Sequence, residues 1–511
     1  MSLLHRVTLC LGLLLPMAAA AQPAPDSAQV LQDQLQSWLA GLLGPGLAAS
    51  APALRVTAEA DHYRIAVPIA GAEGQPEITA AVRPLDAGHW AVDAIRFPAT
   101  TKFTAHLPEP PTGPNADPKA APVLSPTDFT LRIGAQDAHG LIDPSLTSRS
   151  TLDVDVHDID VTGDGPRQHQ QQHIDEERVH TSLAPGNAGL DLDQEGTITG
   201  WRTATRIQDQ PAVAFGIDRM HGTSRIEGLD RDHAAALLAA ITSLIATLPP
   251  AGAATHDAAP LSEPARAALR TLITSLRGVV TTIRGEETID GLHVAVAGKG
   301  ETTIRNIRLG MDGAAPDGVL HGGIDIALDG LAVKDMPPEA AALVPSHVEL
   351  RPTLAGVPVN ELTKLALEAT DDGVDRAQLT ADAMALLDHG GVTVGLDAIS
   401  LALGPAELHG AGHVLLTGPS DYHAEARLAS TGLDELMQQA NGNPHLQQAV
   451  PVLAMLRGLG RPEGKELVWA IVADNTGMTV NGVPIGGGGG GGGDKPHHPG
   501  TAGPQRPANR P

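Results

Sequence analysis

The chain has 511 residues, including 57 Gly and 41 Pro but only 4 Trp, 4 Phe and 2 Tyr, and its 59 acidic residues outnumber 34 basic ones to give a net charge of -25. Such a charge repels phosphate backbones, and so few aromatic rings leave little for bases to stack on, which excludes nucleic-acid binding. Charged residues are 18% and hydrophobic residues 42% of the chain. These fractions exclude a highly charged disordered chain and a membrane bundle, and the length allows two or three cores.

The N-terminus has the features of a secretory signal peptide. His5 and Arg6 precede an apolar run from Val7 to Leu15, and small residues follow at 18–21. The run is too short to span a bilayer of roughly 30 Å, so we expect cleavage near residue 21, export to the periplasm and no transmembrane segment in the mature chain. The only cysteine, Cys10, lies in the removed part. The mature chain would therefore have no disulfide and no thiolate ligand or nucleophile.

The first periodic segments predict a helix followed by a strand. Apolar residues at helical spacing over 28–43 indicate an amphipathic helix that packs on a core, because its polar positions are not basic enough for a membrane surface. Residues 63–69 alternate between apolar and other residues and indicate a half-buried strand. Pro68 places this strand at a sheet edge. The seven prolines of residues 108–126 indicate a surface connection or linker.

From about Thr127 onward, two-residue alternation dominates, as in Leu152–His157, Leu190–Asp193 and Ile324–Asp329. One apolar and one wet face per strand is typical of antiparallel sheets, whereas buried parallel strands form unbroken apolar runs. The alternation therefore predicts an α+β fold with a long, curved antiparallel sheet, packed helices and no disulfides.

A short phrase recurs in this region: Asp, then Gly or Ala, then an aliphatic residue, any residue and an apolar one. It begins at Asp93, Asp290, Asp329 and Asp397, at irregular spacing. At Asp329 and Asp397 the alternation shifts phase by one residue, which predicts a bulge or tight turn that re-aims the strand. The irregular spacing argues against a solenoid.

Helices are predicted where the period changes, with Asp230 and Ser262 as N-caps of the first two. These segments are Arg231 to Leu248, Ser262 to Leu276, Val359 to Ala369, Arg376 to Leu387, Leu433 to Ala440 and His445 to Leu459. Two closing strands, Leu467–Ile471 and Met478–Val480, are joined by a turn at Asp474–Gly477. Eight glycines and a His/Pro-rich tail follow Ile485, and such a tail is expected to be disordered.

These observations divide the chain into seven segments. They are a signal peptide (1–21), an N-terminal helix with strands (22–107), a Pro-rich linker (108–126), a β-rich segment ending in a helix (127–248), a second linker (249–261), a β-rich domain with helices (262–485) and a disordered tail (486–511). Whether the β-rich segments form one sheet or separate domains is left open by the sequence.

Two acidic stretches could hold a cation. Asp191 to Ile198 imitates the start of a calcium loop, but Arg202 stands where the bidentate carboxylate is needed, which favours an ordinary strand and turn. The second stretch contains Asp153, Asp155, Asp158, Asp160 and Asp164. Alternation places Asp153, Asp155 and His157 on one wet face, where a solvated strand is the favoured interpretation.

Histidine spacing suggests two further metal candidates. On a helix, His169 and His173 would share one face, as zinc ligands often do. However, no Glu lies between them as it does in a zinc protease, and the flanking sequence favours a polar loop or strand. His497 and His498 could capture metal adventitiously in the tail. We therefore assign no metal, cofactor-binding or catalytic residue.

Motifs of nucleophilic and phosphate chemistry are missing from the sequence. It contains no Gly-x-Ser-x-Gly elbow, no phosphate loop ending in Gly-Lys-Ser/Thr and no strand-linked Gly-x-Gly-x-x-Gly. A hydrolase would need a triad dispersed among its 22 histidines. We favour a non-catalytic protein over an enzyme.

Three phrases carry a resemblance: Phe215–Leu229, Val348–Pro358 and Thr479–Val483. They resemble uncharacterised exported proteins of alphaproteobacteria grouped under a domain of unknown function, and more distantly the YdgA-like and AsmA-like envelope proteins. The resemblance implies a periplasmic protein built on a long curved antiparallel sheet, and it brings no catalytic residue. Without a retained N-terminal anchor, a bridge between membranes is not implied.

Three functions remain open. The first is a periplasmic binding protein whose sheet shelters a lipid or another apolar ligand. The second is a scaffold that binds envelope proteins through a sheet edge. The third is a hydrolase with a dispersed, motif-free site.

Overall fold

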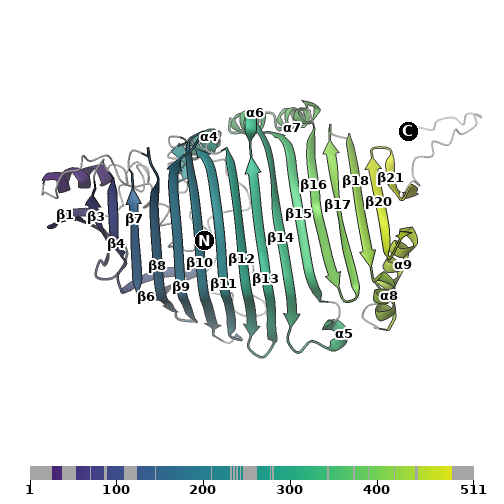
Figure 1. Ribbon diagram of the computed structural model, residues 1–511, viewed down its shortest axis with the longest axis horizontal. Helices are drawn as coiled ribbons and strands as arrows, with labels where there is room; N and C mark the ends of the chain where they lie inside the picture. The colour runs from purple at the N-terminus through teal and green to yellow at the C-terminus, as the bar shows by residue number, and fades with distance from the viewer. Residues whose placement is uncertain are drawn as a thin grey trace, which may run out of the picture.

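In its described residues, the computed structural model of the chain shows one long antiparallel sheet of 22 strands, with helices along its margins (Figure 1). It describes residues 26–36, 53–230 and 262–485, together with single positions between 233 and 244. Short gaps within these ranges are residues 70, 86–88, 109–123, 144–145, 209, 277, 279–280, 342–343, 372–373, 390, 419–420 and 443–446. The α+β class, the antiparallel sheet and the packed helices agree with the alternation in the sequence, and the single cysteine permits no disulfide within the chain.

The N-terminal strands lead to a branch point at β8. In sequence they are β1 (Arg55–Ala58), β2 (Tyr63–Pro68), β3 (Glu77–Pro84), β4 (Trp90–Arg96), β5 (Thr100–Pro108), β6 (Leu124–Ile133), β7 (Gln136–Ile142) and β8 (Ser150–Asp164). β1 to β4 pair in order and β4 pairs with β7. β7 pairs with the first half of β8, whereas the hairpin of β5 and β6 pairs with its second half.

From β8 to β18 each strand pairs with the next one in sequence. They are β9 (Gln168–Pro185), β10 (Leu190–Ile207), β11 (Val213–Leu229), β12 (Thr282–Val296), β13 (Gly300–Ala314), β14 (Val319–Val333), β15 (Pro345–Pro358), β16 (Val392–Leu403), β17 (Ala406–Leu416) and β18 (Tyr422–Thr431). β20 (Glu466–Asp474) then pairs with β18 on one side and with β19 (Arg461–Glu463) and β21 (Gly477–Val480) on the other. β22 (Val483–Ile485) ends the sheet beside β21. Strands before and after the segment 249–261 therefore belong to one sheet.

The helices lie at the ends of the strands and at the C-terminal margin of the sheet (Figure 1). They are α4 (Glu263–Leu276), α5 (Pro338–Ala341), α6 (Val359–Glu368), α7 (Arg376–Ala385), α8 (Leu433–Gly442) and α9 (Val450–Leu459), with 3-10 turns at Pro316–Gly318 and Leu386–His389. A further helix covers residues 26–36. Ser262 and Asp230 cap as expected: Ser262 Oγ accepts from Ala265 N at 3.4 Å, and Asp230 Oδ1 accepts from His233 N at 2.9 Å.

Two faces of different chemistry run across the sheet. Residues that are direct cross-strand partners lie on the same side of a sheet, so the pairing register identifies which residues of successive strands share a face. One row of direct partners is wholly apolar: Ile198, Met220, Ile289, Ile307, Leu328 and Val348. The neighbouring row, on the other side, is polar: Thr199, Arg219, Asp290, Asn306, Asp329 and His347. We call these sides the apolar face and the polar face.

A row of backbone irregularities crosses the sheet beside these partners. Gly200 of β10, Gly291 of β12 and Gly330 of β14 have φ of 62°, 64° and 68°. This left-handed conformation favours glycine, and the pairing register is the same on both sides of each of the three. The backbone irregularity predicted at Asp329 is therefore confirmed in the next residue, Gly330. The shift predicted at Asp397 is also confirmed, because the register slips between Leu396 and Ile399.

The apolar face is buried at both ends of the sheet. At the N-terminal end, Leu31 and Leu35 of the first helix share a core with Tyr63, Trp90 and Val156. At the C-terminal end, Leu433 and Leu436 of α8 pack with Trp469 and Val480, and Leu453 of α9 joins them. Burial of these side chains is the main stabilising contribution available to a chain without disulfides.

One sequence interpretation changes with the structure. The strand containing Pro68 is not an edge strand, because β2 pairs with β1 and with β3. Pro68 is tolerated there because β1 ends opposite Tyr63–Ala66, so the missing N–H of Pro68 faces no strand on that side. The proline-rich stretch 108–126 has its two ends in β5 and β6, which pair with each other. The signal peptide, the segment 249–261 and the tail after Ile485 lie outside the described residues.

Candidate functional site

The centre of the apolar face carries large side chains that remain exposed to solvent. Met311 and Ile324 are direct partners on β13 and β14, and their exposed fractions are 48% and 51%. Leu309, Ile326 and Leu350 form the adjacent row and are also exposed by more than a third. Contiguous exposed apolar surface of this kind marks a place where a ligand, partner or membrane is bound.

All of these side chains except Leu350 border a hollow of about 530 Å³, which we call the central groove. It is lined by side chains from β10 to β14: Ile198, Met220, Leu309, Met311, Ile324 and Ile326, with Gly196, Gly222 and Gly285 between them. Five neighbouring strands give the groove a length of roughly 19 Å across the sheet, at about 4.8 Å per strand. Its volume falls in the range of roughly 300–1,000 Å³ that small-molecule sites occupy.

Glycines keep the floor of the groove low. Gly196 and Gly222 are direct partners, and Gly285 follows on β12. Within the part of the chain that the structure describes, a Cβ placed on Gly222 would meet no atom closer than 3.5 Å, and one on Gly285 would lie 3.5 Å from Met311 Cγ. Neither glycine has a positive φ. The space above them is therefore open to a larger side chain or to a ligand.

Buried polar atoms without partners lie at one side of the groove. Gln194 lines the groove, is only 8% exposed, and its Nε2 donates no hydrogen bond within the described residues. Thr181, its direct partner on β9, is 4% exposed, and its Oγ1 is equally unpaired among them. Leaving a buried donor unpaired costs about 1–3 kcal/mol, so a ligand oxygen that accepts from Gln194 would recover this energy.

The polar face has a different organisation over β8 and β9, where acidic and basic residues stand directly opposite each other. Five such pairs are Asp153 with His180, Asp155 with Arg178, His157 with Glu176, Asp160 with His173 and Asp164 with His169. We call this series the β8–β9 ladder. Three imidazoles bind their opposite carboxylates closely, with N to O distances of 2.6 Å for His180, 2.8 Å for His173 and 2.5 Å for His169. Opposite charges in direct cross-strand positions contribute to pairing of the strands.

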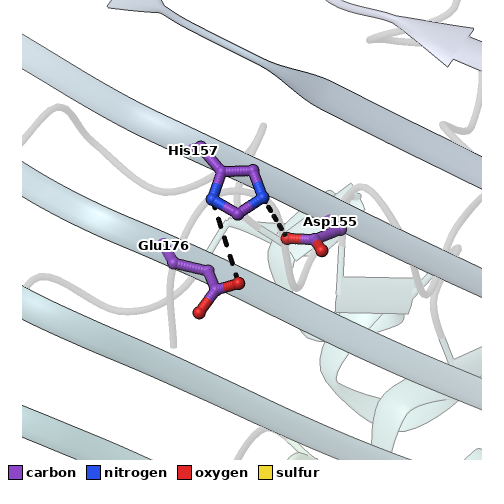
Figure 2. Close-up of side chains that lie close together, drawn as sticks. All are labelled: Asp155, His157 and Glu176. Atoms are coloured by element: carbon purple, nitrogen blue, oxygen red, sulfur yellow. Dashed lines mark ion pairs between the residues drawn. The ribbon is translucent and has the colours of Figure 1, made fainter.

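The middle pair of the ladder forms a cluster with a third side chain. His157 lies between two carboxylates, with Nε2 3.1 Å from Asp155 Oδ1 and Nδ1 3.8 Å from Glu176 Oε1 (Figure 2). One ligand atom from each of the three residues lies within 4.8 Å of the others. All three residues are half-buried, and they supply one nitrogen and two oxygen donors, a set that zinc accepts.

The structure separates the other metal candidates of the sequence. Asp191 to Ile198 is extended in β10, where Asp191 Oδ1 accepts from Gly228 N at 3.2 Å and Asp193 lies 3.4 Å from Arg225, so it forms no calcium loop. His169 and His173 lie on β9 rather than on a helix, and each contacts a different aspartate, Asp164 and Asp160. His497 and His498 lie outside the described residues. Sequence reasoning did not select Glu176, whose role depends on the register between two strands.

A serine, a histidine and an aspartate also meet near the start of β8. His89 Nε2 lies 2.9 Å from Ser148 Oγ, and Asp143 Oδ2 lies 3.9 Å from the same His89 nitrogen. In a catalytic triad the aspartate contacts the imidazole nitrogen remote from the serine. Here Asp143 Oδ2 instead accepts from the backbone and hydroxyl groups of Thr147 and Ser148. The arrangement connects Asp143 with Thr147 and Ser148 and does not match a triad.

Comparisons with known proteins add no relative. No protein-family model, no curated protein and no solved structure matches the chain. None of the helices in the described part of the chain combines the length and apolar character needed to span a bilayer.

Proposed function

We propose that the protein is a non-catalytic periplasmic binding protein that holds the acyl chain of a lipid in the central groove. The observation that carries this proposal is the exposed aliphatic row of β13 and β14 beside a floor of glycines. A neutral hydrocarbon chain would remove this surface from water, at about 0.8 kcal/mol for each buried CH₂ group. The periplasmic part rests on the signal-peptide pattern and on the family resemblance.

The chemistry of the lining favours a lipid over a protein partner. Protein interfaces concentrate their binding energy in Trp, Tyr and Arg, whereas the exposed row here consists of Leu, Ile and Met. Gln194 adds an unpaired amide donor at the margin of the groove. The ligand that fits both features has an apolar chain and an oxygen acceptor, as an acyl ester has. Glu287, which also lines the groove, disfavours a second negative charge beside it.

Variants that fill the groove provide the sharpest test. Gly222→Leu and Gly285→Leu place a side chain on the apolar face with little initial contact, because each Cβ has room. Thr288→Leu is the matched control, since it adds a leucine to the opposite face of the strand that carries Gly285 and does not line the groove. The full-length protein would be titrated with a fluorescent acyl ester. We expect at least tenfold weaker binding for the two glycine variants and little change for Thr288→Leu.

Chain length gives an independent readout. Affinity for methyl esters should rise by roughly fourfold per added CH₂ group, the equivalent of about 0.8 kcal/mol, until the groove is full. Native mass spectrometry of the protein purified from its own periplasm should show a co-purifying lipid mass that disappears in Gly222→Leu. Equal binding by wild type and both filled variants, or no dependence on chain length, would show that the groove is not the site. Fractionation of cells checks the location: recovery in the cytoplasmic fraction would refute the periplasmic part.

A further inference from the structure

At one position of the β8–β9 ladder, two carboxylates face a single imidazole at longer nitrogen-to-oxygen distances than in the other histidine pairs. In the neighbouring pairs each histidine has a carboxylate oxygen within 2.8 Å. His157 instead lies 3.1 Å from Asp155 and 3.8 Å from Glu176. From these distances and the donor set we propose that Asp155, His157 and Glu176 form a binding site for a divalent zinc ion on the polar face.

An unsatisfied oxygen at the centre of the cluster supports a bound cation. Among the described residues, Asp155 Oδ1 is shielded from solvent and accepts no hydrogen bond, and its one contact is the ion pair with His157 Nε2 at 3.1 Å. Buried acceptors without partners are rare in native proteins and call for a water or an ion. A zinc ion bound to this oxygen would satisfy it and would need only one nitrogen of His157.

The backbone presents the three ligands together. Asp155 and His157 are two residues apart on β8, so they share the polar face, and Glu176 is the direct partner of His157 on β9. His157 also sits where β8 changes partner: its N–H donates to Ala135 O at 2.8 Å and its carbonyl accepts from Gly134 N at 3.1 Å. Zinc ligands bind at about 2.0–2.2 Å, so the three atoms would have to approach one another by about an ångström, which side-chain rotation allows. Water would complete the coordination.

Arg178 is the cation already next to this site. Its Nε lies 3.1 Å from Asp155 Oδ2, and its Nη2 contacts Glu176 Oε1. The guanidinium therefore holds both carboxylates in place through one oxygen each and leaves Asp155 Oδ1 to another ligand. The positive charge of the guanidinium also weakens binding of a zinc ion beside it. Replacing Arg178 should strengthen zinc binding, whereas a purely structural ion-pair cluster would gain no metal affinity.

The test is a calorimetric titration of the full-length protein with Zn²⁺ at about pH 7.5, well above the ordinary histidine pKa of about 6.5. All proteins would carry His497→Ala and His498→Ala, which remove the tail histidines as competing ligands. We expect one zinc ion per chain, at least tenfold weaker binding for His157→Ala and for Glu176→Gln, and severalfold tighter binding for Arg178→Gln. His173→Ala is the matched control, because His173 is also a ladder histidine between two carboxylates and should leave zinc binding within twofold.

A spectroscopic measurement identifies the ligands. Co²⁺ added to the Arg178→Gln protein should give visible absorption bands of a site with nitrogen and oxygen ligands, and His157→Ala should abolish them. Circular dichroism checks that each variant is folded. If His157→Ala does not fold, the zinc affinity of Glu176→Gln tests the site instead. The proposal is overturned if the Arg178→Gln protein binds no zinc, or if the histidine and glutamate variants bind it as tightly as their parent.

Discussion

The side chain of Asp175 in β9 occupies the space directly beside the α-carbon of Gly200 in β10. A Cβ on Gly200 would overlap the Asp175 carboxylate. That carboxylate is fixed in place, because Oδ1 lies 2.9 Å from His173 Nε2 and 3.1 Å from Arg202 Nη1. Gly200 therefore serves two needs at once, a left-handed backbone and room for its neighbour.

Substitution of Gly200 should measure this double requirement. We expect Gly200→Ala to lower the free energy of unfolding by at least about 1–2 kcal/mol, the cost of the left-handed conformation for an L-residue, with the overlap in addition. Gly298→Ala is the control for the backbone alone, since Gly298 has φ of 73° but no described residue within 4 Å of an added Cβ. Urea denaturation measures both variants. Equal losses in the two would show that Asp175 imposes no steric requirement.

The histidine of the next ladder pair should make stability depend on pH. The hydrogen bond that His173 donates to Asp160 raises the pKa of His173, and Asp175 raises it further. A raised folded-state pKa means that the stabilisation is complete below the unfolded value of about 6.5 and is lost as the pH rises through the folded value. The difference in unfolding free energy between wild type and His173→Gln should therefore be larger at about pH 5 than at about pH 9. Asp160→Asn should reduce this pH dependence, and an unchanged difference across the range would contradict the assignment.

Asn481 joins the last strands to α9. Its Nδ2 donates to Leu459 O and Val468 O, both at 2.8 Å, and its Oδ1 accepts from Ala470 N at 2.9 Å. It also has φ of 50°, which asparagine tolerates better than most residues. We expect Asn481→Ala to cost about 2–4 kcal/mol, from three lost hydrogen bonds at roughly 1 kcal/mol each and the backbone preference. Asn475→Ala, which removes one exposed bond to Asp421, should cost less than about 1 kcal/mol in the same urea titration.

The exposed side of α9, which carries Val452 and Met455, should accept a charged substitution without loss of stability. Val452 and Met455 are 54% and 58% exposed, whereas Leu453 packs on the C-terminal core. Met455→Lys should change the unfolding free energy by no more than about 0.5 kcal/mol, while Leu453→Lys should be strongly destabilising because it buries a charge. Thermal denaturation distinguishes them. A large loss in Met455→Lys would indicate that this side of α9 is covered in solution.

The alternation of single strands was enough to predict the sheet and its antiparallel class. The backbone irregularities could also be predicted. At Asp329 and at Asp397, an Asp followed by a small residue interrupts the two-residue alternation within a single strand, so the interruption is visible in the sequence alone. The edge position of Pro68 was wrong for a related reason: whether a proline meets a partner depends on where the neighbouring strand stops, and β1 stops two residues short of it.

The candidate sites were harder to predict because they combine strands. Alternation correctly placed Asp155 and His157 on one wet face, but Glu176 joins them only through the register of β8 with β9. The central groove gathers residues from Gln194 to Ile326, and each of its five strands contributes only two to four of them. No periodicity within one strand reports which glycines of neighbouring strands will lie side by side.

The order of the strands has a consequence for how such a protein can change its length during evolution. Between the first core and the α8–α9 core, strands β9 to β16 make their extensive contacts almost entirely with their immediate neighbours. Stability in such an array is close to a sum of neighbour terms, as in repeat proteins. A hairpin could therefore be gained or lost from the middle while both ends stay intact, and the apolar surface would lengthen or shorten in steps of two strands.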